Sequence, residues 1–109
     1  MTTITLEKEW IKQAQLFGDV EEVIKDALQA YFIKESQQQV YHAAAQIKTY
    51  HQKYQCDYHI FKERVQTDEE FLAKVEHQNP FWEQDAMEWE YWCEEYQTWH
   101  THLNNISHS

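Results

Sequence analysis

The sequence predicts a mainly α-helical protein with one short strand at its start. Only one glycine and one proline occur among the 109 residues, so few positions interrupt a helix. Over most of the chain, apolar residues recur at three- and four-residue intervals, which is the period of a helix with one buried face. Residues 2–6 instead alternate polar and apolar side chains, as a half-buried strand does.

We expect the segment Thr-Thr-Ile-Thr-Leu at residues 2–6 to form this strand, with Ile4 and Leu6 on one face. A lone strand leaves its backbone donors and acceptors unpaired. Since no second strand-like segment occurs in the chain, the partner strand is expected to come from a second copy. The sequence therefore predicts a homodimer.

Two helices are expected to follow the strand. Apolar spacing predicts the first over about residues 7–17, and Gly18 allows it to end there. Asp19 is a suitable N-cap for the second helix, and acidic residues follow it in the first turn. No helix breaker occurs before residue 55, but the apolar phase slips at residues 35–39. We therefore expect one long helix, or two stacked end to end.

Three further helices are expected in the second half. Asp57 is placed to cap a short helix, and residues 67–70 match a capping box that opens the next one. Pro80 stops that helix, because the residue before a proline avoids helical dihedral angles. A last helix is expected over residues 81–103, with one stripe in alternating three- and four-residue steps. The stripe comprises Trp82, Asp85, Trp89, Trp92, Tyr96, Trp99 and Leu103.

The net charge of −10 is unevenly distributed. Residues 1–55 carry six lysines against seven acidic residues, a net charge of −1, whereas residues 56–109 carry three basic against twelve acidic residues, a net charge of −9. An acidic region of this kind attracts a basic partner. We expect three regions: residues 1–33 for dimerisation, residues 34–56 as a helical connector, and residues 57–109 as an acidic, aromatic region that binds a partner.

The chain shows no motif for catalysis, a cofactor or a metal. One glycine cannot build a phosphate-binding loop, and Cys56 and Cys93 lie outside any CxxC pattern. The histidines at positions 100 and 102 have no third ligand placed for a metal site. No apolar run has the length of a membrane span, and the first residues lack the pattern of a signal peptide. We expect a cytoplasmic binding protein without a cofactor, and not an enzyme.

A strand reading Thr3-Ile4-Thr5-Leu6, a helix, a glycine turn and a second helix over residues 18–31 resemble the ribbon-helix-helix family. The resemblance implies that two copies pair their strands and interlock their helices around one shared core. In that family the outward strand residues contact DNA, and the start of the second helix holds a phosphate. The implied DNA-binding residues are Thr3, Thr5, Asp19 and Val20. The implied dimer core comprises Ile4, Leu6, Trp10, Ile11, Ile24 and Leu28.

The second half resembles the tails of antitoxins from bacterial type II toxin–antitoxin systems, in which helices after a ribbon-helix-helix dimer cover a toxin. The resemblance lies in residues 61–65, Phe-Lys-Glu-Arg-Val, followed later by Phe-Trp at residues 81–82 and Glu-Trp-Glu at residues 88–90. It implies an antitoxin that neutralises a basic toxin, such as a nuclease, and that represses its own operon by binding operator DNA. The candidate partner-binding residues are Trp82, Asp85, Glu88, Trp89, Trp92, Tyr96 and Trp99.

Several alternatives stay open. The aromatic stripe of the last helix suits an internal core seam as well as a partner interface. Its acidic residues suit a solvated helix face as well as mimicry of a nucleic acid. The function that competes with an antitoxin is a dimeric helical adaptor or scaffold without DNA binding. The antitoxin is the leading hypothesis, and the observation that speaks for the adaptor is that the expected strand has no arginine or lysine to neutralise phosphates.

Overall fold

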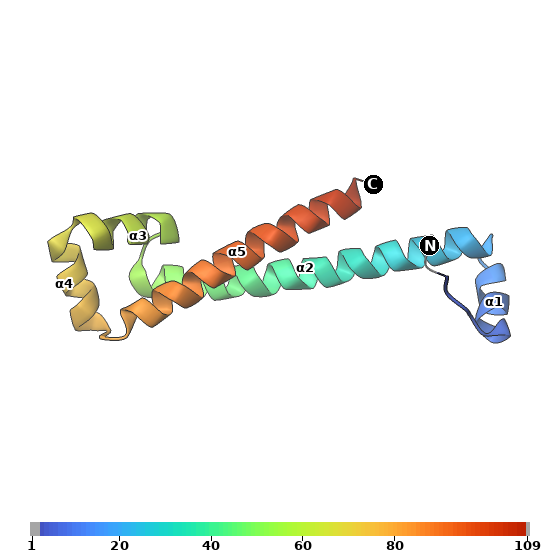
Figure 1. Cartoon of the computed structure of the whole chain (residues 1–109), viewed down its shortest axis with the longest axis horizontal. Coiled ribbons are helices and arrows are strands. Elements are labelled where there is room, and N and C mark those ends of the chain that lie inside the picture. The colour runs from blue at the N-terminus through green and yellow to red at the C-terminus, as the bar shows by residue number, and fades with distance from the viewer. Residues whose placement is uncertain (1–2, 109) are drawn as a thin grey trace.

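The computed structural model describes residues 3–108, which form five helices arranged as a long hairpin (Figure 1). The helices are α1 (Lys8–Gln15), α2 (Val20–Tyr54), α3 (Tyr58–Thr67), α4 (Glu69–Gln78) and α5 (Trp82–Ser107). The molecule measures 67 × 25 × 23 Å. Helices α2 and α5 run antiparallel, α3 and α4 form the turn at one end, and α1 contacts the start of α2 at the other end, at a steep angle to it.

Helix α2 is one uninterrupted helix of 35 residues, which confirms the first of the two expectations for this segment. At its start the side chain of Asp19 accepts a hydrogen bond from the backbone N–H of Glu22 at 3.3 Å, so the predicted N-cap is confirmed. At its end Gln55 adopts the left-handed conformation with φ 57°. The expected boundary between residues 33 and 34 therefore falls inside a continuous helix.

Although other half-buried residues such as Gln46 and Ala86 lie beside them, the positions along which α2 and α5 face each other follow a heptad pattern of alternating three- and four-residue steps, as in a coiled coil. On α2 they are Gln29, Ile33, Ser36, Val40, Ala43, Ile47, Tyr50 and Tyr54. On α5 they are Trp82, Asp85, Trp89, Trp92, Tyr96, Trp99, Leu103 and Ile106. Ser36 is only 2% exposed. The apparent phase slip at residues 35–39 therefore arises because a polar residue occupies a seam position, and the helix keeps its register.

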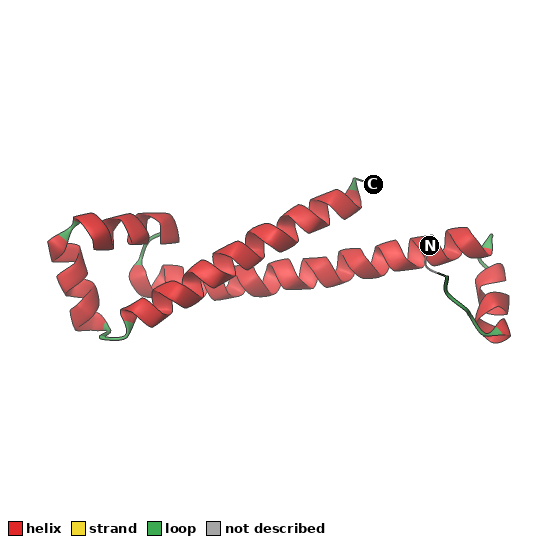
Figure 2. Ribbon diagram, in the orientation of Figure 1, coloured by secondary structure: helices red, strands yellow, loops and turns green. Residues whose placement is uncertain are grey.

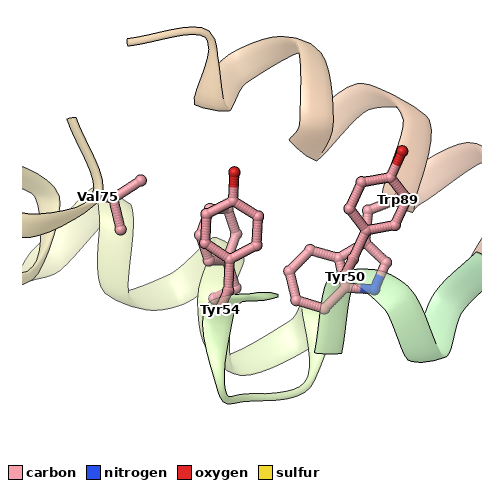
Figure 3. Close-up of a cluster of buried hydrophobic side chains, with 5 residues drawn as sticks. Tyr50, Tyr54, Val75 and Trp89 are labelled. Carbon is pink, nitrogen blue, oxygen red and sulfur yellow. The ribbon is translucent and has the colours of Figure 1, made fainter. Parts of the chain in front are cut away.

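The core of the hairpin lies where α2 and α5 meet α3 and α4. It comprises Tyr50, Tyr54, Phe61, Val75 and Trp89, four of which are labelled in Figure 3. Helix α4 begins one residue later than the predicted capping box, because Asp68 is the N-cap and accepts from the N–H of Phe71 at 3.1 Å. The helix ends at Gln78, as expected from Pro80.

The prediction of an N-terminal strand is wrong. Residues 3–7 form no strand and no helix, and the described part of the chain contains helices and loops only (Figure 2). Thr2, the first residue of the expected strand, lies outside the described residues. The alternation at residues 3–6 is only a local preference, and a strand also needs a second strand to pair with its backbone.

The ribbon-helix-helix prediction is therefore also wrong, since that fold requires a strand. Helix α2 differs from it too, because it continues to Tyr54 instead of ending near residue 31. The mainly α-helical class is confirmed, and the corrected architecture is an antiparallel helical hairpin closed by α3 and α4.

Candidate functional site

Helix α5 does not reach the beginning of α2. Near the end of α5, the side-chain Nε2 of Gln29 donates a hydrogen bond to the backbone oxygen of Ile106 at 3.3 Å. Residues 20–28 of α2 and all of α1 therefore extend beyond the hairpin (Figure 1). We call residues 8–28 the apolar arm.

Large apolar side chains of the apolar arm are open to solvent. Phe17 is 82% exposed, Leu16 is 77% exposed and Trp10 is 65% exposed. Leu28, on the part of α2 that α5 leaves uncovered, is 43% exposed. Exposed apolar side chains of this size mark an interaction site when they gather on one part of a protein surface. The apolar arm is therefore the first candidate binding surface.

The residues predicted for a dimer core lie on this arm or just before it. Ile4, Leu6, Trp10 and Leu28 are exposed, whereas Ile11 and Ile24 are half-buried. Their role in a dimer stays a prediction. The ribbon-helix-helix fold, in which these residues were expected to contact a second copy, is wrong. Most of the six side chains are nevertheless exposed in the structure.

The residues predicted to bind DNA lie at the same end of the molecule. Thr3 and Thr5 are exposed on the extended segment before α1, and Val20 is the half-buried first residue of α2. The carboxylate of Asp19 already occupies the start of α2 as its cap. An anion there would also meet the acidic residues of the first turn, Glu21 and Glu22.

A polar network joins α2 to α5 at the closed end of the hairpin. The carboxylate Oδ2 of Asp85 accepts hydrogen bonds from Lys53 Nζ at 2.6 Å, from the Tyr54 hydroxyl at 2.6 Å and from Asn79 Nδ2 at 3.1 Å. Burial by itself would raise the pKa of Asp85, but the bonds from Lys53 and Tyr54 hold it below its ordinary value. One turn further along, the Tyr50 hydroxyl donates to Glu88 Oε2 at 2.5 Å.

The structure brings the predicted partner-binding residues together on the face of α5 that packs on α2. Trp89 is completely buried, and Asp85 and Glu88 are bonded to α2. The others are half-buried along the seam: Trp82, Trp92, Tyr96 and Trp99. The stripe therefore supplies the internal seam of the hairpin, which was one of its two interpretations.

Sequence reasoning missed the α2 side of this site. Tyr50 was not singled out, although its four-residue spacing to Tyr54 matches two seam positions that can face one tryptophan. Nothing in the sequence around Lys53 or Asn79 indicated that either residue would bond to Asp85. Their roles depend on where α5 returns along α2, which the local pattern does not specify.

The outer face of α5 forms a second candidate surface. Glu83, Glu90 and Glu94 are exposed, and we call these three residues the acidic face. Within residues 3–108, the ion pairs are His51–Asp57, Lys53–Asp85 and Arg64–Asp68, so the acidic face has no basic partner there. No acidic residue of α5 follows position 95. The negative charge is therefore concentrated toward α3 and α4, away from the apolar arm.

No metal-binding cluster of three or more His, Cys, Asp or Glu residues is found between residues 3 and 108. Over the same range, no helix combines the length and apolar character needed to cross a bilayer. The candidate site of this protein therefore consists of two surfaces, the apolar arm and the acidic face. A comparison of the chain with protein-family models, with curated proteins and with solved structures finds no match.

Proposed function

We propose that the protein is a dimeric helical adaptor that associates through the apolar arm and binds a basic protein through the acidic face of α5. The observation that carries the proposal is the exposure of Leu16, Phe17 and Trp10 at one end of a well-packed hairpin. Side chains of this size are stabilised when a partner removes them from water. The proposal is for a binding protein of the cytoplasm, and not for an enzyme.

The charge distribution favours a second copy of the chain as the partner of the apolar arm. The half that contains the arm has a net charge of −1, whereas the other half has −9. Two copies joined at their arms would keep their acidic ends apart, since each molecule is 67 Å long. Repulsion over such distances is weak, because charges are screened within about 8 Å at physiological ionic strength.

A basic protein is the partner that suits the acidic face. Glu83, Glu90 and Glu94 have no basic neighbour within α5. Lys62 of α3 lines the pockets beside them but is in none of the ion pairs found within residues 3–108. Such a surface speeds the encounter with a positively charged protein and disfavours acidic ones.

Neutralisation of a basic toxin is a second candidate function, and the same acidic face favours it. An antitoxin would be one form of the adaptor, with the toxin as its basic partner. The proposed function does not include repression of an operon by DNA binding. The DNA contacts were expected from a paired strand, and residues 3–108 contain none.

The mass of the protein in solution tests the adaptor. We expect light scattering to give about twice the chain mass of 13.4 kDa, and Phe17→Ser to yield a folded monomer. Phe81→Ser is the matched control, because Phe81 is also exposed, at 72%, but lies at the opposite end of the hairpin. A monomeric wild-type protein, or a Phe17→Ser variant that remains dimeric, would contradict the proposal.

The antitoxin form is tested by co-expression with the product of the neighbouring gene. We expect the neighbouring gene product to be toxic and this protein to relieve the toxicity. A variant in which Glu83, Glu90 and Glu94 are changed to Gln should no longer relieve it. A harmless neighbour, or a toxic one that is not neutralised, counts against this form.

A further inference from the structure

An open pocket of about 610 Å³ lies between α2 and α5, outside the apolar arm. Tyr91, Trp92 and Trp99 supply three aromatic rings to it, Glu95 supplies a carboxylate, and His42 faces them from α2. Two glutamines of α2 complete the lining, and neither lysine nor arginine is among the described residues that form it. The pocket is thus aromatic with a single negative charge.

The rings of the pocket hold one another in place. The rings of His42 and Trp92 meet edge to face, with centroids 5.0 Å apart and planes at 79°. Tyr91 contacts the same indole in a similar way, at 5.0 Å and 75°. Edge-to-face contacts of this kind are favourable and orient the rings. Trp92 therefore has a defined orientation before any ligand enters.

The carboxylate of Glu95 is also oriented. Its Oε2 accepts a hydrogen bond from the indole Nε1 of Trp99 at 3.0 Å. The Tyr91 hydroxyl bonds to the same carboxylate, which raises the pKa of Tyr91. A carboxylate offers about four acceptor positions, so these two donors leave room for two more. Both donors are neutral, and the ion pairs found within residues 3–108 leave out Glu95.

We propose that this pocket binds the guanidinium group of an arginine on a basic partner protein. A guanidinium is planar, so it stacks on indole and phenol rings while donating two parallel N–H groups to a carboxylate. A lysine ammonium lacks this flat, two-pronged shape and fits the arrangement less well. The inference rests on the proposed function, because it names the group by which α5 would recognise a basic partner.

The test uses the full chain labelled with ¹⁵N, in which the indole N–H signals of Trp92 and Trp99 report on the pocket. A short arginine-containing peptide should shift both signals in a saturable way. The same peptide with lysine should bind several-fold more weakly, and the version with uncharged citrulline should leave the signals in place. The proposal is overturned if the citrulline or lysine peptide, or tetramethylammonium, binds as well as the arginine peptide, or if no peptide shifts the signals.

Two charge-matched variants locate the binding. Glu95→Gln should weaken arginine-peptide binding about tenfold, because it removes a charge-assisted pair of hydrogen bonds. Glu76→Gln removes the same charge from an exposed position of α4 that does not line the pocket, and should change binding by less than about twofold. Equal weakening by both variants would mean diffuse attraction and would overturn the proposal. Circular dichroism checks that both variants keep the helical fold.

The outcome can be separated from that of the proposed function. The Phe17→Ser variant, which is expected to be monomeric, should bind the arginine peptide as the wild type does, because the pocket lies outside the apolar arm. If a basic protein binds the acidic face while the Trp92 and Trp99 signals stay unchanged, the proposed function stands and the arginine pocket is refuted.

Discussion

The indole ring of Trp89 stacks on the phenol ring of Tyr54, with ring centroids 5.8 Å apart and planes at 17°. Tyr50 stacks on the same indole at 5.8 Å and 23°, as Figure 3 shows. Trp89 is 0% exposed and belongs to α5, whereas both tyrosines belong to α2. The closed end of the hairpin therefore depends on one aromatic stack.

Trp89→Ala should lower the free energy of unfolding by about 3–5 kcal/mol, since it removes a large buried ring and leaves a cavity. Urea unfolding followed by circular dichroism measures the effect. Met87→Ala is the control on the same helix, because Met87 is 72% exposed, and it should change stability by less than about 0.5 kcal/mol. Equal losses in the two variants would show that the stack does not hold the fold.

Trp89→Phe should cost far less than Trp89→Ala. The indole N–H of Trp89 is buried and has no hydrogen-bond partner among the described residues, which is unfavourable by about 1–3 kcal/mol. Phenylalanine removes that group and keeps a stacking ring, so the two effects partly offset each other. The same urea experiment tests this, and a loss as large as that of the alanine variant would contradict it.

Asp85 should stabilise the protein at neutral pH and lose this effect in acid. Because its folded pKa is lowered, the stabilisation is present above the unfolded pKa of about 3.9 and disappears as pH falls through the lower folded value. Asp85→Asn should cost about 1–3 kcal/mol at neutral pH. In urea unfolding at decreasing pH, the difference in stability between the two proteins should begin to shrink below about pH 4 and disappear below the lowered folded pKa of Asp85. Glu83→Gln, at an exposed position of α5, is the control and should cost little.

Alkaline pH should unfold the hairpin through its buried tyrosines. Burial and the bond to Asp85 raise the pKa of Tyr54 to about 12, and burial and Glu90 raise the pKa of Tyr58 to about 12. Burial and Glu88 raise the pKa of Tyr50 further. A raised pKa stabilises the fold fully below the unfolded value of about 10, and this stabilisation is lost as pH rises through the folded value. The helical circular dichroism signal should therefore be lost above pH of about 10 as these three tyrosines ionise. Tyrosinate absorbance that shows ionisation of all tyrosines while the helical signal is intact would contradict this.

Gln55→Gly should stabilise the protein by about 0.5–1 kcal/mol. Gln55 ends α2 with φ 57°, a conformation that glycine adopts without the steric cost of a Cβ atom. Gln37→Gly is the matched control, because Gln37 is exposed inside α2, where glycine should cost about 1 kcal/mol. Thermal unfolding compares the two. A loss of stability in both variants would mean that the left-handed residue is not under strain.

Local signals in the sequence predicted most helix ends correctly. Gly18 has φ 143° between α1 and α2, Asp19 caps α2, and Pro80 follows the end of α4. These features act through the backbone of neighbouring residues, so they are readable without knowledge of the fold. The strand at residues 3–6 failed for the converse reason, because strand formation depends on pairing with a distant segment.

The sequence by itself determined the helical class, most helix ends to within a few residues and the shared face of the α5 aromatic residues, because each depends on the spacing of neighbours along the chain. Only the tertiary structure decided what covers that face. Helix α5 returns along residues 29–54 of α2, so Trp89 is buried there and Phe17 is left in solvent. Amphipathic spacing shows that a helix has an apolar face, but the choice of partner depends on packing between distant segments.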